Sequence, residues 1–260
     1  MHVKLIFKLT SIIYICTTFL CYGCNYNKNQ DNKTHNNEDT IQAPSSSIDF
    51  PNLTYVVFGD SITYGADYSN GYRQMETPYD EEVKNILNLK ESINMGVSGA
   101  TFTRNNIGLV SMSDVIVSYD EPADIISVMG GVNDFNRDLP LGKIEDKTID
   151  TIYGALHVTM SYLKENYPKA YIFYMTPYKE DYSGRYWEDI NSQGYNLKDV
   201  ADAIKEVALL YNIDVLDMFE LGEFESVMYN SDCDGIHPNQ DFILEKTAPQ
   251  IADFLKKNYK

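Results

Sequence analysis

Two side chains in this sequence have the types and the neighbours that nucleophilic catalysis needs. Ser61 follows a short apolar run and a Gly-Asp pair, and a serine hydroxyl becomes a nucleophile when a base takes its proton. His237 comes three residues after Asp234 across a turn that contains glycine. That spacing can bring the carboxylate to the imidazole Nδ1–H and leave Nε2 to accept the serine proton. The pattern predicts acyl transfer with Ser61 as nucleophile, His237 as base and Asp234 as its orienting partner.

Acyl transfer also needs hydrogen-bond donors for the oxyanion that forms on the substrate. Gly99 offers a backbone N–H without a side chain in front of it, and Asn133 offers a neutral side-chain amide. Together with the backbone N–H of Ser61 they make three candidate donors. His157 lies inside a predicted helix beside an apolar stripe, so we expect it to be a structural residue and not the base.

The elements that must position these residues can be predicted from periodicity. Continuous apolar runs bounded by Gly or Pro predict buried strands at 55–58, 92–95, 124–129, 170–175 and 213–216. Apolar residues at steps of three and four predict helices at 81–89, 144–167, 197–211 and 242–255. This alternation predicts an α/β protein, a three-layer α/β/α sandwich with a five-stranded parallel sheet. Active groups of such sheets gather just after the strands, where Ser61, Gly99 and Asn133 all stand.

Four sequence blocks, in order, are similar to the SGNH or GDSL hydrolase family. They begin at Gly59-Asp60-Ser61, Asn94-Met95-Gly96, Gly131-Val132-Asn133-Asp134 and Asp234-Gly235-Ile236-His237. The resemblance covers about residue 52 to the C-terminus. It implies a flavodoxin-like fold, ester hydrolysis by Ser, His and Asp without a cofactor, and Gly99 as an oxyanion glycine. The pattern G-x-S-x-G is absent, which argues against the strand-turn-helix elbow of α/β-hydrolases.

An aromatic stretch follows the fourth predicted strand. It holds Tyr178, Tyr182, Tyr186 and Trp187, the only tryptophan. Aromatic faces at the rim of a crevice can stack on sugar rings or hold acyl chains, so these four residues are candidate substrate contacts. With 21 tyrosines in the chain, chance clustering is the alternative.

Charge and composition exclude several partners. The chain has 260 residues, 38 acidic and 21 basic, and a formal charge of −17. So acidic a chain repels phosphate backbones, which argues against nucleic acid. Neither GxGxxG nor the Walker pattern is present, and no pair of histidines has metal-ligand spacing. We therefore expect no cofactor and no metal; the oligomeric state cannot be predicted.

The N-terminus has the pattern of an export signal. Two lysines and a dozen apolar or small residues precede Gly23-Cys24, which resembles a bacterial lipoprotein signal. The pattern predicts a signal peptide over 1–23, lipid attachment at Cys24, a flexible tether over 24–50 and a hydrolase domain over 51–260. Plain secretion is the alternative. Membrane contact would then come only through this anchor.

The sequence as a whole predicts an exported or envelope-anchored serine esterase. Its expected substrates are short acyl esters, such as acetyl groups on carbohydrate. The alternatives are a lysophospholipase or lipase-like acylhydrolase and a non-catalytic glycan-binding protein on the same scaffold.

Overall fold

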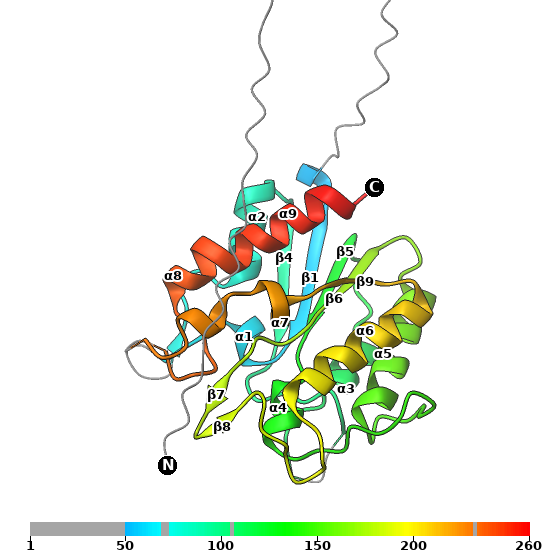
Figure 1. Cartoon of the computed structure of the whole chain (residues 1–260). Helices are drawn as coiled ribbons and strands as arrows, with labels where there is room; N and C mark the ends of the chain where they lie inside the picture. Colours follow the sequence, from blue (N-terminus) through cyan, green and yellow to red (C-terminus); the bar gives the residue numbers. More distant parts are fainter. Residues whose placement is uncertain (1–49, 69–72, 105–106, 231–232) are drawn as a thin grey trace, which may run out of the picture. The chain divides into compact units, whose positions relative to one another are not determined.

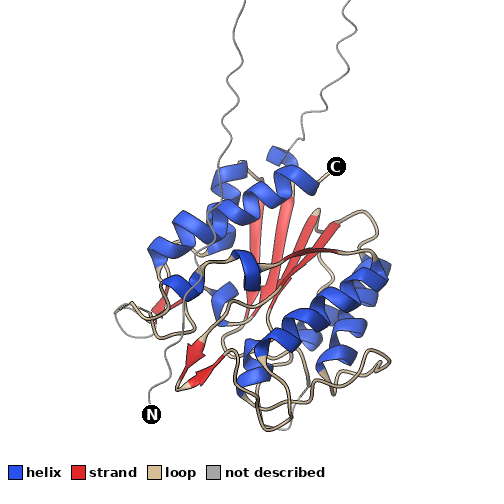
Figure 2. Cartoon of the chain, viewed as in Figure 1, coloured by secondary structure: helices blue, strands red, loops and turns tan. Residues whose placement is uncertain are grey.

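A five-stranded, wholly parallel sheet runs through the residues that the computed structural model describes, which are 50–68, 73–104, 107–230 and 233–260. The strand order is β4 (Glu91–Gly96), β1 (Thr54–Gly59), β5 (Ile125–Met129), β6 (Tyr171–Met175) and β9 (Asp214–Leu216). Two short antiparallel pairs lie outside it: β2 (Ala66–Asp67) with β3 (Arg73–Gln74), and β7 (Asp181–Tyr182) with β8 (Arg185–Tyr186). Figure 2 shows the sheet between two groups of helices, so the predicted sandwich is confirmed.

Each face of the sheet has its own hydrophobic core because side chains of a strand alternate between faces. Tyr55 and Val57 of β1 belong to the core with α2 (Tyr79–Leu87) and α9 (Ala248–Asn258). Val56 and Phe58 belong to the opposite core, with α3 (Met112–Ser118), α5 (Ile152–Asn166) and α6 (Leu197–Tyr211). Figure 1 shows these two helix groups on opposite sides of the sheet. All six residues of β1 are buried, which explains its continuous apolar run.

Short helices and turns complete the described chain. They are η1 (Phe50–Asn52), α1 (Ser61–Tyr64), α4 (Val132–Asn136), α7 (Met218–Leu221), η2 (Phe224–Ser226), α8 (Gln240–Phe242) and η3 (Ile243–Thr247). The expected helix over 144–167 begins only at Ile152, because the Thr151 hydroxyl caps it by accepting from the Gly154 N–H at 3.2 Å. No helix within the described ranges is long and apolar enough to cross a bilayer.

Candidate active site

The strand ends bring three of the predicted site residues together. Gly59, the last residue of β1, pairs with Gly96 of β4 and with Met129 of β5, so the three strands end at the same level. The segments that follow them carry Ser61, Gly99 and Asn133. After β1, the chain adds β4 on one side of that strand and then β5 on the other side. Parallel α/β sheets form their ligand sites at such a reversal of strand order.

Ser61 is the first residue of the short helix α1. Asp60 caps this helix, since its carboxylate accepts a hydrogen bond from the Ile62 N–H at 3.0 Å. Burial raises the pKa of Asp60 to about 6, although the Ile62 N–H and nearby His237 oppose that rise. Asp60 therefore has a structural role, because it fixes the turn from which Ser61 points.

His237 joins Ser61 across 176 residues of sequence. Its Nε2 lies 2.7 Å from the Ser61 Oγ, and its Nδ1 lies 2.8 Å from Asp234 Oδ2. The other carboxylate oxygen of Asp234 accepts the backbone N–H groups of Ile236 and His237. Burial opposes ionisation of Asp234, but these bonds and the imidazole lower its pKa below the usual value. The geometry can move a proton from the hydroxyl to an imidazole whose orientation a carboxylate fixes.

The turn that holds His237 depends on a glycine and on a neighbouring hairpin. Gly235 has a φ of +89°, and a Cβ built there would lie 1.9 Å from the carbonyl oxygen of Asp181. The Asp181 N–H donates to the Gly235 carbonyl at 2.9 Å. A side chain at position 235 would therefore separate the turn from the β7–β8 pair.

A pocket of about 410 Å³ opens in front of the hydroxyl, within the size range of small-molecule sites. Ser61, Gly99, Asn133 and His237 all line it. Gly99 has a φ of +77° with open space where a Cβ would stand, so its backbone is accessible from the pocket.

Helix α4 carries Asn133 and is held in place from behind. The Asn133 side-chain amide donates to the Ala100 carbonyl at 3.0 Å, which fixes its nitrogen beside the Gly99 segment. Asp134 accepts the N–H groups of Phe102 and Thr103, and burial raises its pKa to about 6. These contacts lock α4 to the segment that follows β4.

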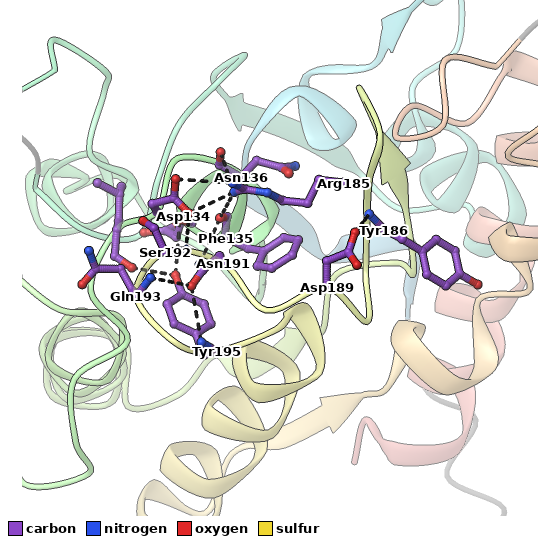
Figure 3. A network of polar contacts seen from close by, with 12 residues as sticks. Asp134, Phe135, Asn136, Arg185, Tyr186, Asp189, Asn191, Ser192, Gln193 and Tyr195 are labelled. Atoms are coloured by element: carbon purple, nitrogen blue, oxygen red, sulfur yellow. Dashed lines mark hydrogen bonds and ion pairs between the residues drawn. The ribbon is translucent and has the colours of Figure 1, made fainter.

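Strand β8 and the segment after it support the opposite end of α4 (Figure 3). Arg185 Nη1 donates to the carbonyls of Phe135 and Asn136 at 2.9 and 3.0 Å. Asn191 Nδ2 donates to the same Phe135 carbonyl at 3.2 Å. The last carbonyls of a helix have no partner within it, so these side chains both satisfy them and fix where the helix lies.

A buried glutamate stands behind the same helix. Glu180 is 1% exposed, and its Oε1 accepts from the Asn136 side-chain amide at 3.0 Å. Its Oε2 has no hydrogen-bond partner in the described part of the chain. Burial is the main cause that raises its pKa to about 8, against the Asn136 bond, while the charges of Asp181 and Asp234 add to the rise. This carboxyl is therefore predominantly neutral at pH 7.

The aromatic stretch mostly serves the fold. Of the four aromatic residues in this stretch, only Tyr182 lines the pocket. The prediction that Tyr178 contacts substrate is wrong. Tyr178 is 2% exposed, packs on Phe224 and Phe242, and shares a hydrogen bond with Thr247.

The other two aromatic residues lie outside the pocket lining. The Tyr186 hydroxyl and the Trp187 indole N–H donate to the same oxygen of Glu225, at 2.6 and 3.2 Å. They fasten the segment after β8 to the turn η2. The sequence could not separate this role from substrate stacking, because Glu225 lies 38 residues away from Trp187 in the chain.

Several pocket residues had no signal in the sequence. The ring of Tyr68 stacks on His237 with a centroid distance of 4.3 Å, and Arg137 and Arg185 also line the pocket. His157 lies outside the pocket lining; it is buried and contacts Tyr211 and the Ile144 carbonyl.

Two further expectations concern a metal site and the N-terminal segment. Within residues 50–68, 73–104, 107–230 and 233–260, no three His, Cys, Asp or Glu side chains are grouped to hold a metal ion. The signal peptide, the lipid attachment at Cys24 and all of the predicted tether over 24–50 except its last residue lie in 1–49, outside the described residues.

Solved structures share the fold. A protein of Lactobacillus plantarum is 25% identical, with a TM-score of 0.67 and coverage of 80% of this chain and 99% of that one. A possible lipase from Chitinophaga pinensis is 23% identical, with a TM-score of 0.58 and coverage of 79% and 98%. The native aryl esterase of M. smegmatis is 16% identical, with a TM-score of 0.60 and coverage of 79% and 99%. No curated protein matches the chain.

The family itself is shown by the sequence. The model of the GDSL-like lipase/acylhydrolase family matches residues 57–241, which span β1 to α8 and contain Ser61, Gly99, Asn133, Asp234 and His237. The chain therefore belongs to the GDSL-like lipase/acylhydrolase family of ester-cleaving hydrolases.

Proposed function

We propose that the chain is a serine esterase that forms an acyl-enzyme on Ser61. The observation that carries this proposal is the unbroken hydrogen-bonded series from Ser61 through His237 to Asp234, with heavy-atom distances of 2.7 and 2.8 Å. His237 Nε2 takes the hydroxyl proton as Ser61 Oγ attacks the ester carbonyl. The same nitrogen returns that proton to the leaving alkoxide, and water then hydrolyses the acyl-enzyme.

The oxyanion of the tetrahedral intermediate would rest on three donors. These are the backbone N–H groups of Ser61 and Gly99 and the side-chain amide of Asn133. All three residues line one pocket. Fixed donors of this kind stabilise charge in the transition state without reorganising during the reaction.

We propose short acyl esters, above all acetyl esters on carbohydrate, as the substrates. The pocket supports this choice because Ile236 is its only aliphatic residue among the described lining residues. The other lining residues are polar, glycine or tyrosine. A long acyl chain would find little apolar surface there, whereas a hydroxylated alcohol would find hydrogen-bond partners.

The experiment is turnover of p-nitrophenyl acetate with a Ser61→Ala variant. Loss of the nucleophile should lower kcat on the order of 10⁴-fold or more, and a fluorophosphonate should label the wild-type chain but not the variant. Unchanged turnover would remove Ser61 from its role. A wild-type chain that neither turns over the ester nor takes the label would be a binding protein on this scaffold.

The substrate class has its own test. Acetylated glycans should release acetate, and a series of p-nitrophenyl esters should show falling kcat/KM with acyl length. A preference for long chains would instead indicate a lysophospholipase or lipase-like acylhydrolase.

For location we propose export, with a lipid anchor on Cys24. The support is the lysine-containing, then apolar, start of the sequence before Gly23-Cys24. Intact mass of membrane-extracted protein should show a diacylglycerol adduct on a chain that begins at Cys24. A mass without the adduct would reject the anchor.

A further inference from the structure

Helix α4 presents more than Asn133 to the pocket. Asn136 and Arg137 line it too, at three and four residues after Asn133. The Arg137 N–H donates to the Asn133 carbonyl at 3.1 Å, so the helical turn continues through Arg137. Residues four apart lie on the same side of a helix, about 6 Å along its axis. The Arg137 side chain therefore leaves the helix one turn away from the Asn133 amide, which we assign to the oxyanion.

The charge of this pocket is opposite to that of the chain. The sequence has 38 acidic against 21 basic residues, yet two arginines and no Asp or Glu are among the described residues that line the pocket. Pockets lined by one sign of charge concentrate ligands of the other sign. The site is thus complementary to an anion on a molecule that otherwise repels anions.

Three of the four arginines have their charge matched. Arg73 pairs with Asp67, Arg104 with Asp114 and Arg185 with Asp138. Arg137 has neither an ion pair nor a side-chain hydrogen bond in the parts of the chain that the structure describes. Among the described residues, the one arginine without a protein partner is therefore an arginine of the candidate active site.

The two pocket arginines differ in how firmly they are held. Arg185 is bound to the carbonyls of Phe135 and Asn136, as Figure 3 shows, and its guanidinium lies 5.5 Å from the centre of the Phe135 ring. Its donors are committed to α4 and to Asp138. The five donors of Arg137 remain for a ligand, and a planar guanidinium binds carboxylate or phosphate oxygens through two parallel bonds.

We propose that Arg137 is a specificity-determining residue that binds an anionic oxygen group on the alcohol part of the substrate. This inference rests on the proposed function. An acetyl group carries no ionisable group. The anion must therefore belong to the alcohol, as in an acetylated sugar acid or sugar phosphate. Arg137 then selects esters whose alcohol carries a carboxylate or phosphate within one helical turn of the reacting carbonyl.

The test compares a matched pair of esters, 4-acetoxybenzoate and its neutral methyl ester. The quantity measured is the ratio of kcat/KM for the anionic ester to that for the neutral ester, in wild type and in variants. Differences in intrinsic ester reactivity cancel when these ratios are compared. Arg137→Gln should lower the ratio about tenfold, mainly by raising the KM of the anionic ester. A tenfold change corresponds to ~1.4 kcal/mol.

Arg104→Gln is the control. It removes the same charge from an exposed arginine outside the pocket lining, so it should change the ratio less than about twofold, since exposed ion pairs contribute little. Raising the ionic strength should lower the ratio in wild type and leave it constant in Arg137→Gln. An acetoxyphenyl phosphate arm shows which anion is preferred.

The outcomes separate the two proposals. If wild type hydrolyses the neutral ester and Arg137→Gln leaves the ratio unchanged, the specificity inference is wrong and the esterase proposal stands. An equal fall of the ratio in Arg104→Gln would also overturn the inference, because net charge would then explain it. If wild type hydrolyses neither ester, the esterase proposal itself fails.

Discussion

The pocket has two halves that are built in different ways. One half consists of Ser61, Gly99 and Asn133, each placed by the end of a parallel strand whose neighbours are fixed by ladder hydrogen bonds. The other half consists of the β7–β8 pair and the turn that holds His237, which are joined by the Asp181–Gly235 hydrogen bond. The proposed reaction at the ester carbonyl depends on both halves, but only the first half inherits its geometry from the sheet.

The difference teaches which changes should affect the reaction and which should affect only its framework. A substitution at a strand end should act directly on the proposed contacts to the oxyanion. A substitution in the loop half acts by displacing the imidazole or by loosening a segment. The four predictions below test this division, from the largest expected effect to the smallest.

Asn133→Ala should act on the transition state. We expect kcat to fall on the order of 10²- to 10³-fold, with a smaller rise in KM, since one oxyanion donor is lost. Steady-state kinetics with p-nitrophenyl acetate measures both. A rise in KM at constant kcat would assign Asn133 to ground-state binding.

Gly235→Ala should break the link inside the loop half, between the β7–β8 pair and the turn that holds His237. The new Cβ would meet the Asp181 carbonyl at 1.9 Å, so His237 should shift and kcat should fall about a hundredfold, because a displacement of ~1 Å has that effect. Gly194→Ala is the matched control: its φ of +87° is similar, but no atom lies within 4 Å of the added carbon. It should lower stability slightly and leave kcat unchanged. Equal effects of both variants would show that backbone strain alone is responsible.

Glu180→Gln should change how stability depends on pH. The unfolded glutamate ionises above its ordinary pKa of 4.5, whereas the native one stays protonated up to about 8. Between these values the unfolded chain binds fewer protons, so the free energy of unfolding falls as pH rises. The variant lacks this decline, so its Tm relative to wild type should rise by several degrees from pH 5 to pH 8.

Thermal melts at the two pH values measure this shift. Glu245→Gln removes an exposed carboxyl and should give the same Tm difference from wild type at both. A Glu180→Gln difference that does not change with pH would show that Glu180 is ionised in the native protein.

Tyr186→Phe should have the smallest effect. It removes the 2.6 Å hydrogen bond to Glu225, so we expect a loss of ~1 kcal/mol of stability and an unchanged KM. Tyr182→Ala, in the pocket, should instead change KM. If Tyr186→Phe raised KM as Tyr182→Ala does, the aromatic stretch would contact substrate after all.

The sequence was most informative where structure is set locally. The five strands lie within one or two residues of the apolar runs that predicted them, and α6 spans 197–211 as expected. The short helices α3 and α4 escaped prediction because seven and five residues are too few to show a helical period.

In the candidate site, too, the residues that the sheet places were predictable, and those that depend on contacts distant in sequence were not. Ser61, Gly99 and Asn133 meet in one pocket because their strand-end positions follow from the parallel sheet, and His237 reaches the same pocket from a loop. Tyr68 and Arg137 could not be predicted, because their place in the pocket depends on how a loop folds back and how a short helix turns. Tyr178 was misplaced because its burial against Phe224 and Phe242 comes from contacts distant in sequence.

The backbone bond between Asp181 and Gly235 has a practical consequence for redesign. The hairpin that carries Tyr182 and Arg185 is the obvious place to retarget this protein, since both residues line the pocket. Lengthening or grafting that hairpin should displace His237 as well, because the two loops share one N–H···O contact. New selectivity should therefore be sought by exchanging side chains on an unaltered loop length.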